Sequence, residues 1–257
     1  MKNYLIFLFV FVQMYSSCSQ ESHERFTVEP AKILRNVRSW SYYQRDYLRL
    51  SENFIAFDSN FNIINKDIFF KVLASGGFLP AKLISKDSLP HYELYKLNSS
   101  VNEGLQSVIK DFGELEYKHY QMEGKLMPNL DFTDLDGNIY NRKTTLGKTL
   151  VVKCWFINCQ VCIEEMPALN KVIEQYKNRK DMLFLSLAFD NKEDLKKFLA
   201  KTTFKYAVVS NQENYILNDL KITLFPTHLI INKNGIITKI VNSSDELIAA
   251  LKNEKLY

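Results

Sequence analysis

The order of apolar and polar positions predicts an alternating α/β domain in the second half of the chain, from about residue 123. Near-continuous apolar runs at 149–156 and 182–188 are typical of strands that are buried on both faces of a parallel sheet. Each run precedes a segment in which apolar residues recur every three or four positions, at about 160–176 and 191–201. That spacing predicts helices with one apolar face. Strands that alternate with helices indicate an α/β sheet.

The end of the chain adds an antiparallel hairpin to this sheet. We expect a strand near 206–209, a short helix near 213–220, strands at 227–231 and 236–241, and a final helix that begins at Ser243 or Ser244. The segment Asn232-Lys-Asn-Gly235 between the last two strands is a hairpin signal. Another turn, at Asp136-Gly137-Asn138, separates short strands at 130–135 and 139–140. The prediction for residues 123–257 is therefore a central mixed sheet flanked by helices.

The first half of the chain shows different patterns, which predict a small α+β domain at residues 30–122. Two short apolar runs at 54–57 and 61–64 flank a polar turn, and this favours a hairpin. Apolar residues at helical spacing predict an amphipathic helix over about 99–120. The segment 123–129 contains Gly and Pro, which interrupt the helical pattern and mark the domain boundary. No motif in this half indicates a function.

Residues 1–18 predict an export signal. Lys2 precedes an apolar run from Tyr4 to Val12, which is far shorter than the roughly 20 residues that cross a bilayer. Small residues and Cys18 follow, a pattern that resembles the lipobox of bacterial lipoproteins, in which the cysteine is acylated. Tyr15 departs from that pattern, and ordinary cleavage with Cys18 discarded is the alternative. A polar tether at 19–29 follows, and we expect a lipid at Cys18 to be the only membrane attachment.

Composition fits a globular protein and gives nucleic-acid binding little support. Of the 257 residues, 46% are hydrophobic and 24% are charged, which suits a chain with one or two cores. The formal net charge is +4, and the lysines are scattered among acidic residues instead of forming a basic stripe. We therefore expect no nucleic-acid partner.

Three of the four cysteines lie within nine residues: Cys154, Cys159 and Cys162. A structural zinc site needs four ligands, and no histidine lies close enough in sequence to suggest the fourth. Haem attachment would need histidine where Ile163 stands. We therefore expect no metal and no cofactor, and the CxxC spacing of Cys159 and Cys162 favours thiol-disulfide chemistry. Cys154 lies inside a predicted strand and is expected to be a buried core thiol.

Cys159 and Cys162 lie where the predicted strand at 149–156 ends and the next helix begins. The unpaired backbone N–H groups and the positive dipole end at a helix start stabilise a thiolate. Cys162 lies one turn further on the same face, close enough for a disulfide, whose Cα atoms are about 4.4 to 6.8 Å apart. We expect Cys159 to be the accessible attacking thiolate and Cys162 the shielded thiol that resolves the mixed disulfide.

The segment around the cysteines resembles the active site of a known family. The segment is Val151-Val-Lys-Cys-Trp-Phe-Ile-Asn-Cys-Gln-Val-Cys-Ile-Glu-Glu-Met-Pro-Ala-Leu169, and Phe225-Pro226-Thr227 follows later. With the turn region before it, this half of the chain is similar to TlpA/ResA-like thioredoxins. The resemblance implies a thioredoxin-like fold in which Trp155, Phe225 and Pro226 bind substrate. In relatives the proline that corresponds to Pro226 is cis; an ordinary proline at the start of a strand is the alternative.

Two further residues are candidates for tuning the cysteine pair. Lys153 occupies the position of a buried acid in thioredoxin, and a buried lysine would favour a nearby thiolate. The alternative is that its stem carries the ammonium group to solvent. Glu165, three residues after Cys162, could relay a proton to the resolving thiolate, and a surface glutamate near a helix start is the alternative. His228 is expected to be a packed core residue.

The leading hypothesis is an exported thiol-disulfide oxidoreductase that exchanges disulfides with partner proteins through Cys159. The resemblance implies a reductase of protein disulfides in the cell envelope or periplasm, with electrons supplied by a membrane partner. Asn158 and Val161 depart from the family pattern beside the cysteines, so the motif does not predict the redox potential. Two alternatives are a binding module with a structural disulfide and a peroxiredoxin-like peroxidase. The peroxidase would need threonine where Phe156 stands.

Overall fold

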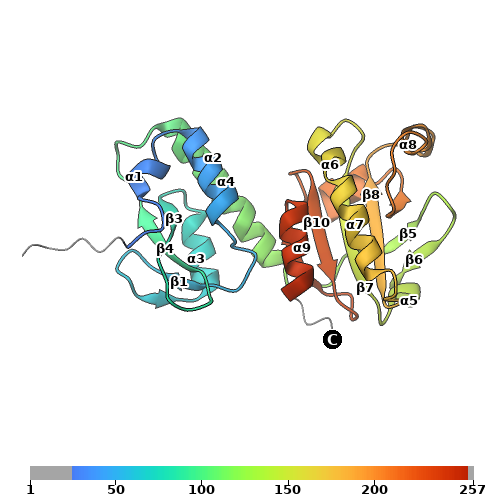
Figure 1. The fold of residues 1–257 in the computed structure, drawn as a ribbon, viewed down its shortest axis with the longest axis horizontal. Helices are drawn as coiled ribbons and strands as arrows, with labels where there is room; N and C mark the ends of the chain where they lie inside the picture. Colours follow the sequence, from blue (N-terminus) through green and yellow to red (C-terminus); the bar gives the residue numbers. More distant parts are fainter. Residues whose placement is uncertain (1–24, 254–257) are drawn as a thin grey trace, which may run out of the picture.

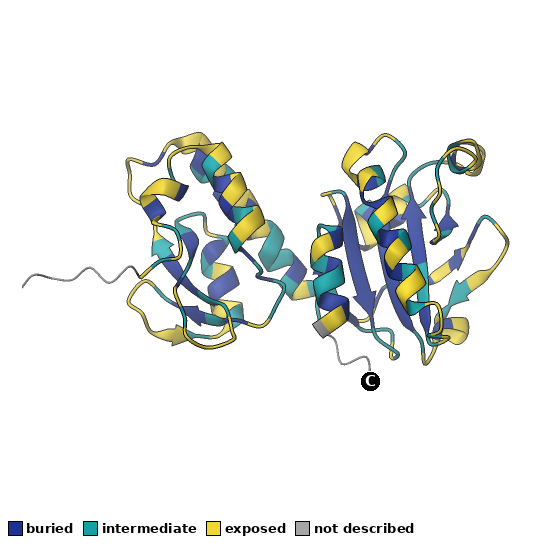
Figure 2. Ribbon diagram, in the orientation of Figure 1, coloured by how far each residue is buried: buried dark blue, intermediate teal, exposed yellow. Residues whose placement is uncertain are grey.

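The computed structural model describes residues 25–253, which form two parts with separate hydrophobic cores (Figure 1). One core lies between Ile33 and Phe112, and the other part is built around residues between Met127 and Leu251. Figure 2 shows the buried residues gathered inside each part. The predicted signal peptide, most of the tether and Cys18 lie outside the described residues. Within residues 25–253 no helix is long and apolar enough to cross a membrane.

The first part combines helices with a four-stranded sheet in the order β2-β1-β4-β3. Its elements are α1 (Pro30–Ile33), α2 (Val37–Tyr47), β1 (Ile55–Phe57), β2 (Ile63–Ile64), α3 (Lys66–Leu73), β3 (Phe78–Lys82), β4 (His91–Lys96) and α4 (Glu103–Met122). The β1–β2 hairpin and α4 confirm two predictions. Apolar periodicity did not predict α2, α3, β3 or β4. A local signal for both helices exists, because Asn36 and Asn65 cap their first turns.

Aromatic rings and one close helix contact hold this first part together. Phe54 packs edge-on against Phe69 and Tyr92, with ring centroids 5.2 and 5.3 Å apart. Such pairs add to the free energy that burial of the rings supplies. Helices α3 and α4 meet at Gly113, where a Cβ atom would lie 2.6 Å from the carbonyl oxygen of Leu73. A larger residue at position 113 would push the helices apart.

The second part is a five-stranded mixed sheet in the order β11-β10-β7-β8-β9. Its strands are β7 (Thr149–Trp155), β8 (Met182–Ala188), β9 (Ala207–Val209), β10 (Thr227–Ile231) and β11 (Ile237–Val241). Strands β7, β8 and β9 are parallel, whereas β10 is antiparallel to β7 and β11. The hairpin of β5 (Asp131–Thr133) and β6 (Ile139–Asn141) precedes them. The predicted mixed sheet of thioredoxin type is confirmed.

The helices of the second part are α5 (Arg142–Thr145), α6 (Gln160–Glu164), α7 (Met166–Tyr176), α8 (Lys192–Leu199) and α9 (Ser244–Asn253). The segment predicted as one helix is divided at Glu165, and Pro167 lies in the first turn of α7. Proline fits there because the first N–H groups of a helix have no internal partner. The short helix predicted near 213–220 is a π-helical turn at Tyr215–Asp219.

The pleat of β7 decides which of its side chains face the helices α7 and α9. Val151 packs with Leu169 of α7 and Leu247 of α9. Lys153 lies two residues further along β7, so its side chain points to the same face of the sheet. His228 of β10 pairs directly with Lys153 across the antiparallel ladder and shares that face.

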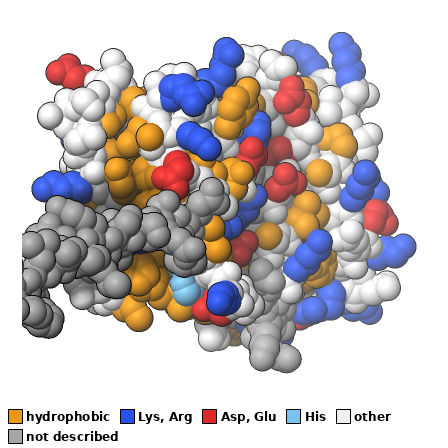
Figure 3. Space-filling view, turned by 60° about the vertical axis from the view of Figure 1, so that its left-hand side comes forward, with side chains coloured by type: hydrophobic (Ala, Val, Ile, Leu, Met, Phe, Trp, Pro, Cys, Tyr) orange, Lys and Arg blue, Asp and Glu red, His pale blue; other side chains and the backbone are white. Residues whose placement is uncertain are grey.

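The end of α4 joins the two parts at the edge strand β11. The backbone N–H of Gly124 donates to the carbonyl of Ile237, and the N–H of Ile237 donates to the carbonyl of Lys125, both over 2.8 Å. From β11, Lys239 donates to the carbonyl of Ser51 over 2.7 Å. On the side of the molecule that Figure 3 shows, basic and acidic side chains are interspersed, as the scattered charges of the sequence predict.

Candidate active site

The two cysteines of the CxxC segment form a disulfide at the start of α6. Their sulfur atoms lie 2.10 Å apart and their Cα atoms 5.2 Å apart. Cys159 is the N-cap of α6, and its Sγ accepts a hydrogen bond from the backbone N–H of Cys162 over 3.3 Å. An N–H donor of the first helical turn thus points at the sulfur of Cys159. After reduction, the same donor would stabilise a thiolate there.

The two cysteines differ in their access to solvent. Cys159 is 9% exposed, whereas Cys162 is fully buried. Two apolar side chains near the disulfide are exposed at the surface: Val161 is 55% exposed and Leu224 is 45% exposed. A disulfide of another protein therefore meets Cys159 first, on a surface that suits contact with apolar groups.

The loop before β10 forms the part of the site that lies beside the disulfide. The Phe225–Pro226 peptide bond is cis, as the resemblance implied. The ring of Phe225 packs edge-on against Phe156 and Phe189 at 5.5 and 5.0 Å, and it contacts the apolar cluster that contains both cysteines. Within residues 25–253, no backbone hydrogen bond reaches Phe225. Its N–H and C=O groups are therefore open to an extended chain.

Trp155 occupies a different position from the other predicted substrate contacts. Its side chain is fully buried and packs against Phe198 and Phe204, with ring centroids 5.6 and 5.7 Å apart. The indole therefore supports the end of β7 from inside the core. This differs from the direct substrate contact that the resemblance implies.

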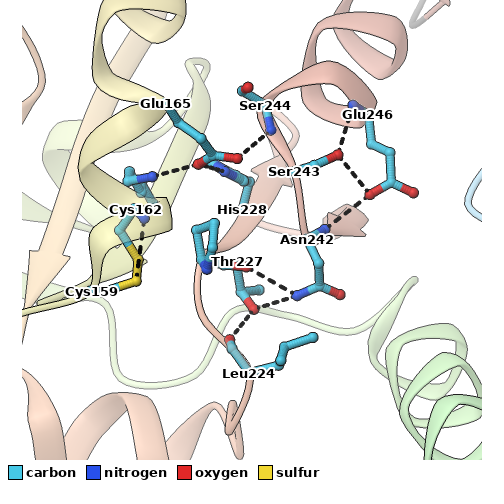
Figure 4. A network of polar contacts seen from close by, with 12 residues as sticks. Cys159, Cys162, Glu165, Leu224, Thr227, His228, Asn242, Ser243, Ser244 and Glu246 are labelled. Atoms are coloured by element: carbon cyan, nitrogen blue, oxygen red, sulfur yellow. Dashed lines mark hydrogen bonds and ion pairs between the residues drawn. A yellow bond between two sulfur atoms is a disulfide. The ribbon is translucent and has the colours of Figure 1, made fainter. Parts of the chain in front are cut away.

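A buried carboxylate, Glu165, lies between α6 and α7, three residues after Cys162 (Figure 4). The Nζ atom of Lys153 and the Nε2 atom of His228 lie 2.7 and 3.0 Å from its Oε2 atom. Its Oε1 atom accepts a hydrogen bond from the backbone N–H of Ser244, at the start of α9, over 2.6 Å. Lys153 and His228 are fully buried, and Glu165 is 9% exposed. The alternatives of a solvent-reaching Lys153 and a surface Glu165 are therefore wrong.

Burial and charge decide the protonation states of this cluster. Burial by itself raises the pKa of Glu165, but His228 and Lys153 outweigh that effect and lower the pKa to about 2. Burial lowers the pKa of His228, so its neutral ring donates a hydrogen bond through Nε2. Burial also lowers the pKa of Lys153, against the attraction of Glu165. Because the imidazole is neutral, Lys153 supplies the positive charge that balances the carboxylate.

Asn242 fastens the cis-proline loop to the end of β11. Its Nδ2 atom donates to Thr227 Oγ1 over 2.7 Å and to the carbonyl of Pro226 over 3.2 Å. Thr227 Oγ1 in turn donates to the carbonyl of Leu224 over 2.7 Å. Figure 4 shows these contacts beside the cysteine pair. The sequence carried no signal for Asn242 or Ser244, because both reach the site only through the packing of β11 and α9.

Cys154 lies apart from this chemistry. It is a free, buried thiol, and burial raises its pKa far above the ordinary value. It therefore belongs to the core, as expected. Among the residues that the structure describes, no group of three or more His, Cys, Asp and Glu side chains could hold a metal ion.

Reversible exchange of thiols and disulfides is the chemistry that this geometry supports, and the sheet that carries it has the thioredoxin topology. Known proteins agree. The model of the AhpC/TSA family matches residues 124–240. The thiol-disulfide oxidoreductase ResA of Bacillus cereus is 30% identical over 120 residues, which cover 46% of this chain and 69% of that protein. ResA of Geobacillus kaustophilus is 25% identical over 121 residues, covering 47% and 70%. The chain belongs to the ResA-like thiol-disulfide oxidoreductases.

Among solved structures, the thioredoxin domain of a thiol-disulfide oxidoreductase from Bacteroides vulgatus is 25% identical, with a TM-score of 0.46. It covers 51% of this chain and 95% of its own. The family model begins at residue 124, so it leaves the first part of this chain unmatched. Family membership makes the protein an oxidoreductase and supports exchange over the binding-module and peroxidase alternatives.

Proposed function

We propose that this protein is exported and acts as a reductase of protein disulfides in the cell envelope. The unequal exposure of Cys159 and Cys162 supports the exchange reaction, because a one-sided thiol pair can attack a partner and then release it, and the export signal expected at residues 1–18 supports the location. We further propose that residues 30–122 and 123–257 are separate domains and that the second contains the whole reaction centre.

The proposed reaction has two balanced steps. The Cys159 thiolate attacks one sulfur of a substrate disulfide, so that a mixed disulfide forms and one substrate thiolate leaves. The Cys162 thiolate then attacks Cys159 Sγ, the mixed disulfide breaks, and the second substrate thiolate leaves. The substrate has gained two electrons, and Cys159 and Cys162 are joined by a disulfide. A dithiol donor at the membrane must return those two electrons before the next cycle.

Glu165 and Lys153 are proposed to tune the second step. With a pKa of about 2, Glu165 stays ionised at neutral pH, so it holds Lys153 and His228 in place better than it carries a proton. The ammonium of Lys153 favours negative charge on a neighbouring thiol. We therefore assign the tuning of Cys162 to Lys153, and we make Glu165 the positioning residue.

Substrate binding is proposed at the cis-proline loop. The open backbone groups of Phe225 can pair with an extended substrate chain, as one strand pairs with the edge of a sheet. Pro226 is buried and holds the loop in shape beside the disulfide. This arrangement would recognise a polypeptide backbone independently of its sequence.

Attachment through Cys18 is proposed as the means by which the protein stays in the envelope. Labelling cells with a radioactive fatty acid tests it: the wild-type chain should be labelled, and a Cys18→Ala variant should not. An unlabelled wild-type chain would refute the lipid anchor and leave the redox function untouched.

The equilibrium potential of the Cys159/Cys162 pair tests the reductase proposal. It is measured by titration in dithiothreitol or glutathione buffers, followed by alkylation and mass determination. A potential near or below about −270 mV, that of thioredoxin, is expected. A potential near about −120 mV would make the protein an oxidant instead. Cys159→Ser and Cys162→Ser variants are the controls, since neither can form the internal disulfide.

A further inference from the structure

A pocket of about 460 Å³ lies between the two parts of the molecule. Helices α2 and α4 form one wall, and the loop before β10 and the β11–α9 junction form the other. Apolar side chains such as Leu48, Phe112 and Ile240 contribute to both walls. The redox chemistry described above uses none of these groups.

The α4 wall presents two polar side chains without partners. Glu116 and His119, one turn apart on α4, both line the pocket. His119 is only 7% exposed, and within residues 25–253 no hydrogen bond or ion pair is formed by either side chain. Buried polar groups are nearly always paired in native proteins. His119 therefore lacks the partner that a buried side chain normally has, whereas Glu116 is half-buried at the pocket wall, and a ligand in the pocket would supply partners to both.

The acidic side chains of the pocket favour a positively charged ligand. The opposite wall carries Glu246, whose Oε2 atom accepts hydrogen bonds from the N–H of Asn242 and the hydroxyl of Ser243. Burial, then Glu246 and Glu123, raises the pKa of Glu116 to about 8, and burial and Lys118 lower that of His119 to about 4. At neutral pH Glu116 is therefore mostly protonated, and an incoming cation would favour its ionised form, because the charges that act on it are those of Glu246 and Glu123.

The two arginines of the pocket lining form their hydrogen bonds with groups other than Glu116, although the charge of Arg49 acts on Glu246. Arg45 forms an ion pair with Asp46 on the surface, with 2.7 Å between Nε and Oδ1. The Nη1 atom of Arg49 donates to the carbonyls of Arg45 and Leu48 over 2.8 and 2.6 Å. Neither guanidinium forms a hydrogen bond with Glu116 among the described residues.

The pocket is continuous with the proposed substrate surface. Leu224 lines it, and Phe225, with its open backbone groups, is the next residue along the chain. Asn242, also in the lining, holds the carbonyl of Pro226. An extended chain that pairs with Phe225 and continues past Leu224 would enter the pocket. Figure 4 shows Leu224 and Asn242 on the side of the loop that faces Glu246.

We propose that the pocket receives a segment of the polypeptide whose disulfide is being reduced, and that it selects a lysine or arginine side chain in that segment. This inference rests on the proposed reductase function. It gives the first part of the molecule a role, since α2 and α4 would choose among substrates while Cys159 and Cys162 carry out the exchange.

Two synthetic peptide sets test this proposal on the full-length reduced protein. Each peptide carries one cysteine as a mixed disulfide with glutathione, and either lysine or glutamate stands at successive positions on both sides. Oxidised glutathione is the small probe, because it has no polypeptide segment that could extend from the disulfide into the pocket. At the best position, the lysine peptide should have a kcat/KM about tenfold higher than the glutamate peptide, equivalent to about 1.4 kcal/mol.

Two variants locate the preference. Glu116→Gln removes the carboxylate, and Ser41→Trp fills the pocket from its exposed rim. Each should abolish the lysine preference while the rate with oxidised glutathione stays within about twofold, a change of only about 0.4 kcal/mol. Glu114→Gln is the matched control, because Glu114 lies on α4, is exposed and pairs with Lys110. It should keep the preference.

Three outcomes would overturn the inference. The lysine preference could persist in both Glu116→Gln and Ser41→Trp, it could be absent from the wild type, or both variants could lose equal activity toward peptides and oxidised glutathione. If the wild-type protein reduces neither kind of disulfide, the proposed reductase function fails, and this inference fails with it.

Discussion

Lys153 and Glu165, 12 positions apart in the chain, form an ion pair between strand β7 and the junction of α6 and α7, with 2.7 Å between Nζ and Oε2. Removing two charges from water costs several kcal/mol per ion, and only good geometry with further hydrogen bonds offsets that cost. His228 and the N–H of Ser244 provide those bonds to the carboxylate. Loss of either side chain would therefore leave the other one buried without its partner.

The first prediction concerns stability. Glu165→Gln should lower the free energy of unfolding by about 3–5 kcal/mol, because it leaves the Lys153 ammonium buried without its counter-ion. Urea denaturation of the oxidised protein measures the change. The exposed neighbour Glu164 accepts a hydrogen bond from Gln160 on the surface, so Glu164→Gln should change stability by less than about 0.5 kcal/mol. A loss from Glu165→Gln as small as that of the control would contradict the buried pair.

The second prediction concerns the free energy of unfolding at acidic pH. The pKa of Glu165 falls from an ordinary 4.5 to about 2 on folding. Its contribution to stability is therefore complete above pH 4.5 and is lost as the pH falls toward 2, to a total of about 3 kcal/mol. Unfolding free energies measured between pH 5 and 2 should decline more steeply for the wild type than for Glu165→Gln. Parallel curves would show that the carboxyl titrates normally in the folded state.

The third prediction concerns which of the two cysteines reacts first. In the reduced protein at pH 7, iodoacetamide should label Cys159 about tenfold faster than Cys162, because the N–H of the first helical turn stabilises the Cys159 thiolate and Cys162 is fully buried. Peptide mass mapping measures both rates. Cys162→Ser should also accumulate a mixed disulfide with substrate, whereas Cys159→Ser should not. Faster labelling of Cys162 would reverse the assigned roles.

The fourth prediction concerns the two proposed domains. A Cβ atom at position 113 would lie 2.6 Å from the carbonyl of Leu73, so Gly113→Ala should destabilise the first part by about 1–3 kcal/mol or more through overpacking. Hydrogen exchange should then rise in residues 25–122, while the Cys159/Cys162 potential stays unchanged. Gly77→Ala is the control, because the nearest atom to a Cβ there is 3.9 Å away. A shifted potential in Gly113→Ala would mean that the parts do not fold separately.

Local apolar patterns predicted the main strands and helices of the second part, but they missed several elements of the first part. The strands β7 and β8 are long, buried on most positions and followed by periodic helices, so their pattern has one interpretation. In the first part, β3 contains Pro80 and β4 contains Glu93, which is buried beside Arg25. These residues do not alternate in the usual way, because tertiary contacts rather than a simple apolar face stabilise the two strands.

The sequence alone determined the position of the reactive cysteines, because a strand that runs into a helix places a CxxC pair at the helix start whatever surrounds it. It also determined that Lys153 and Glu165 lie near that pair. Only the tertiary structure decided that both are buried and bonded to each other, because their contact depends on how α6 packs over β7. It alone added His228 and Asn242, and it alone placed Glu116 opposite Glu246, since residues so far apart in the chain meet only when two cores pack together.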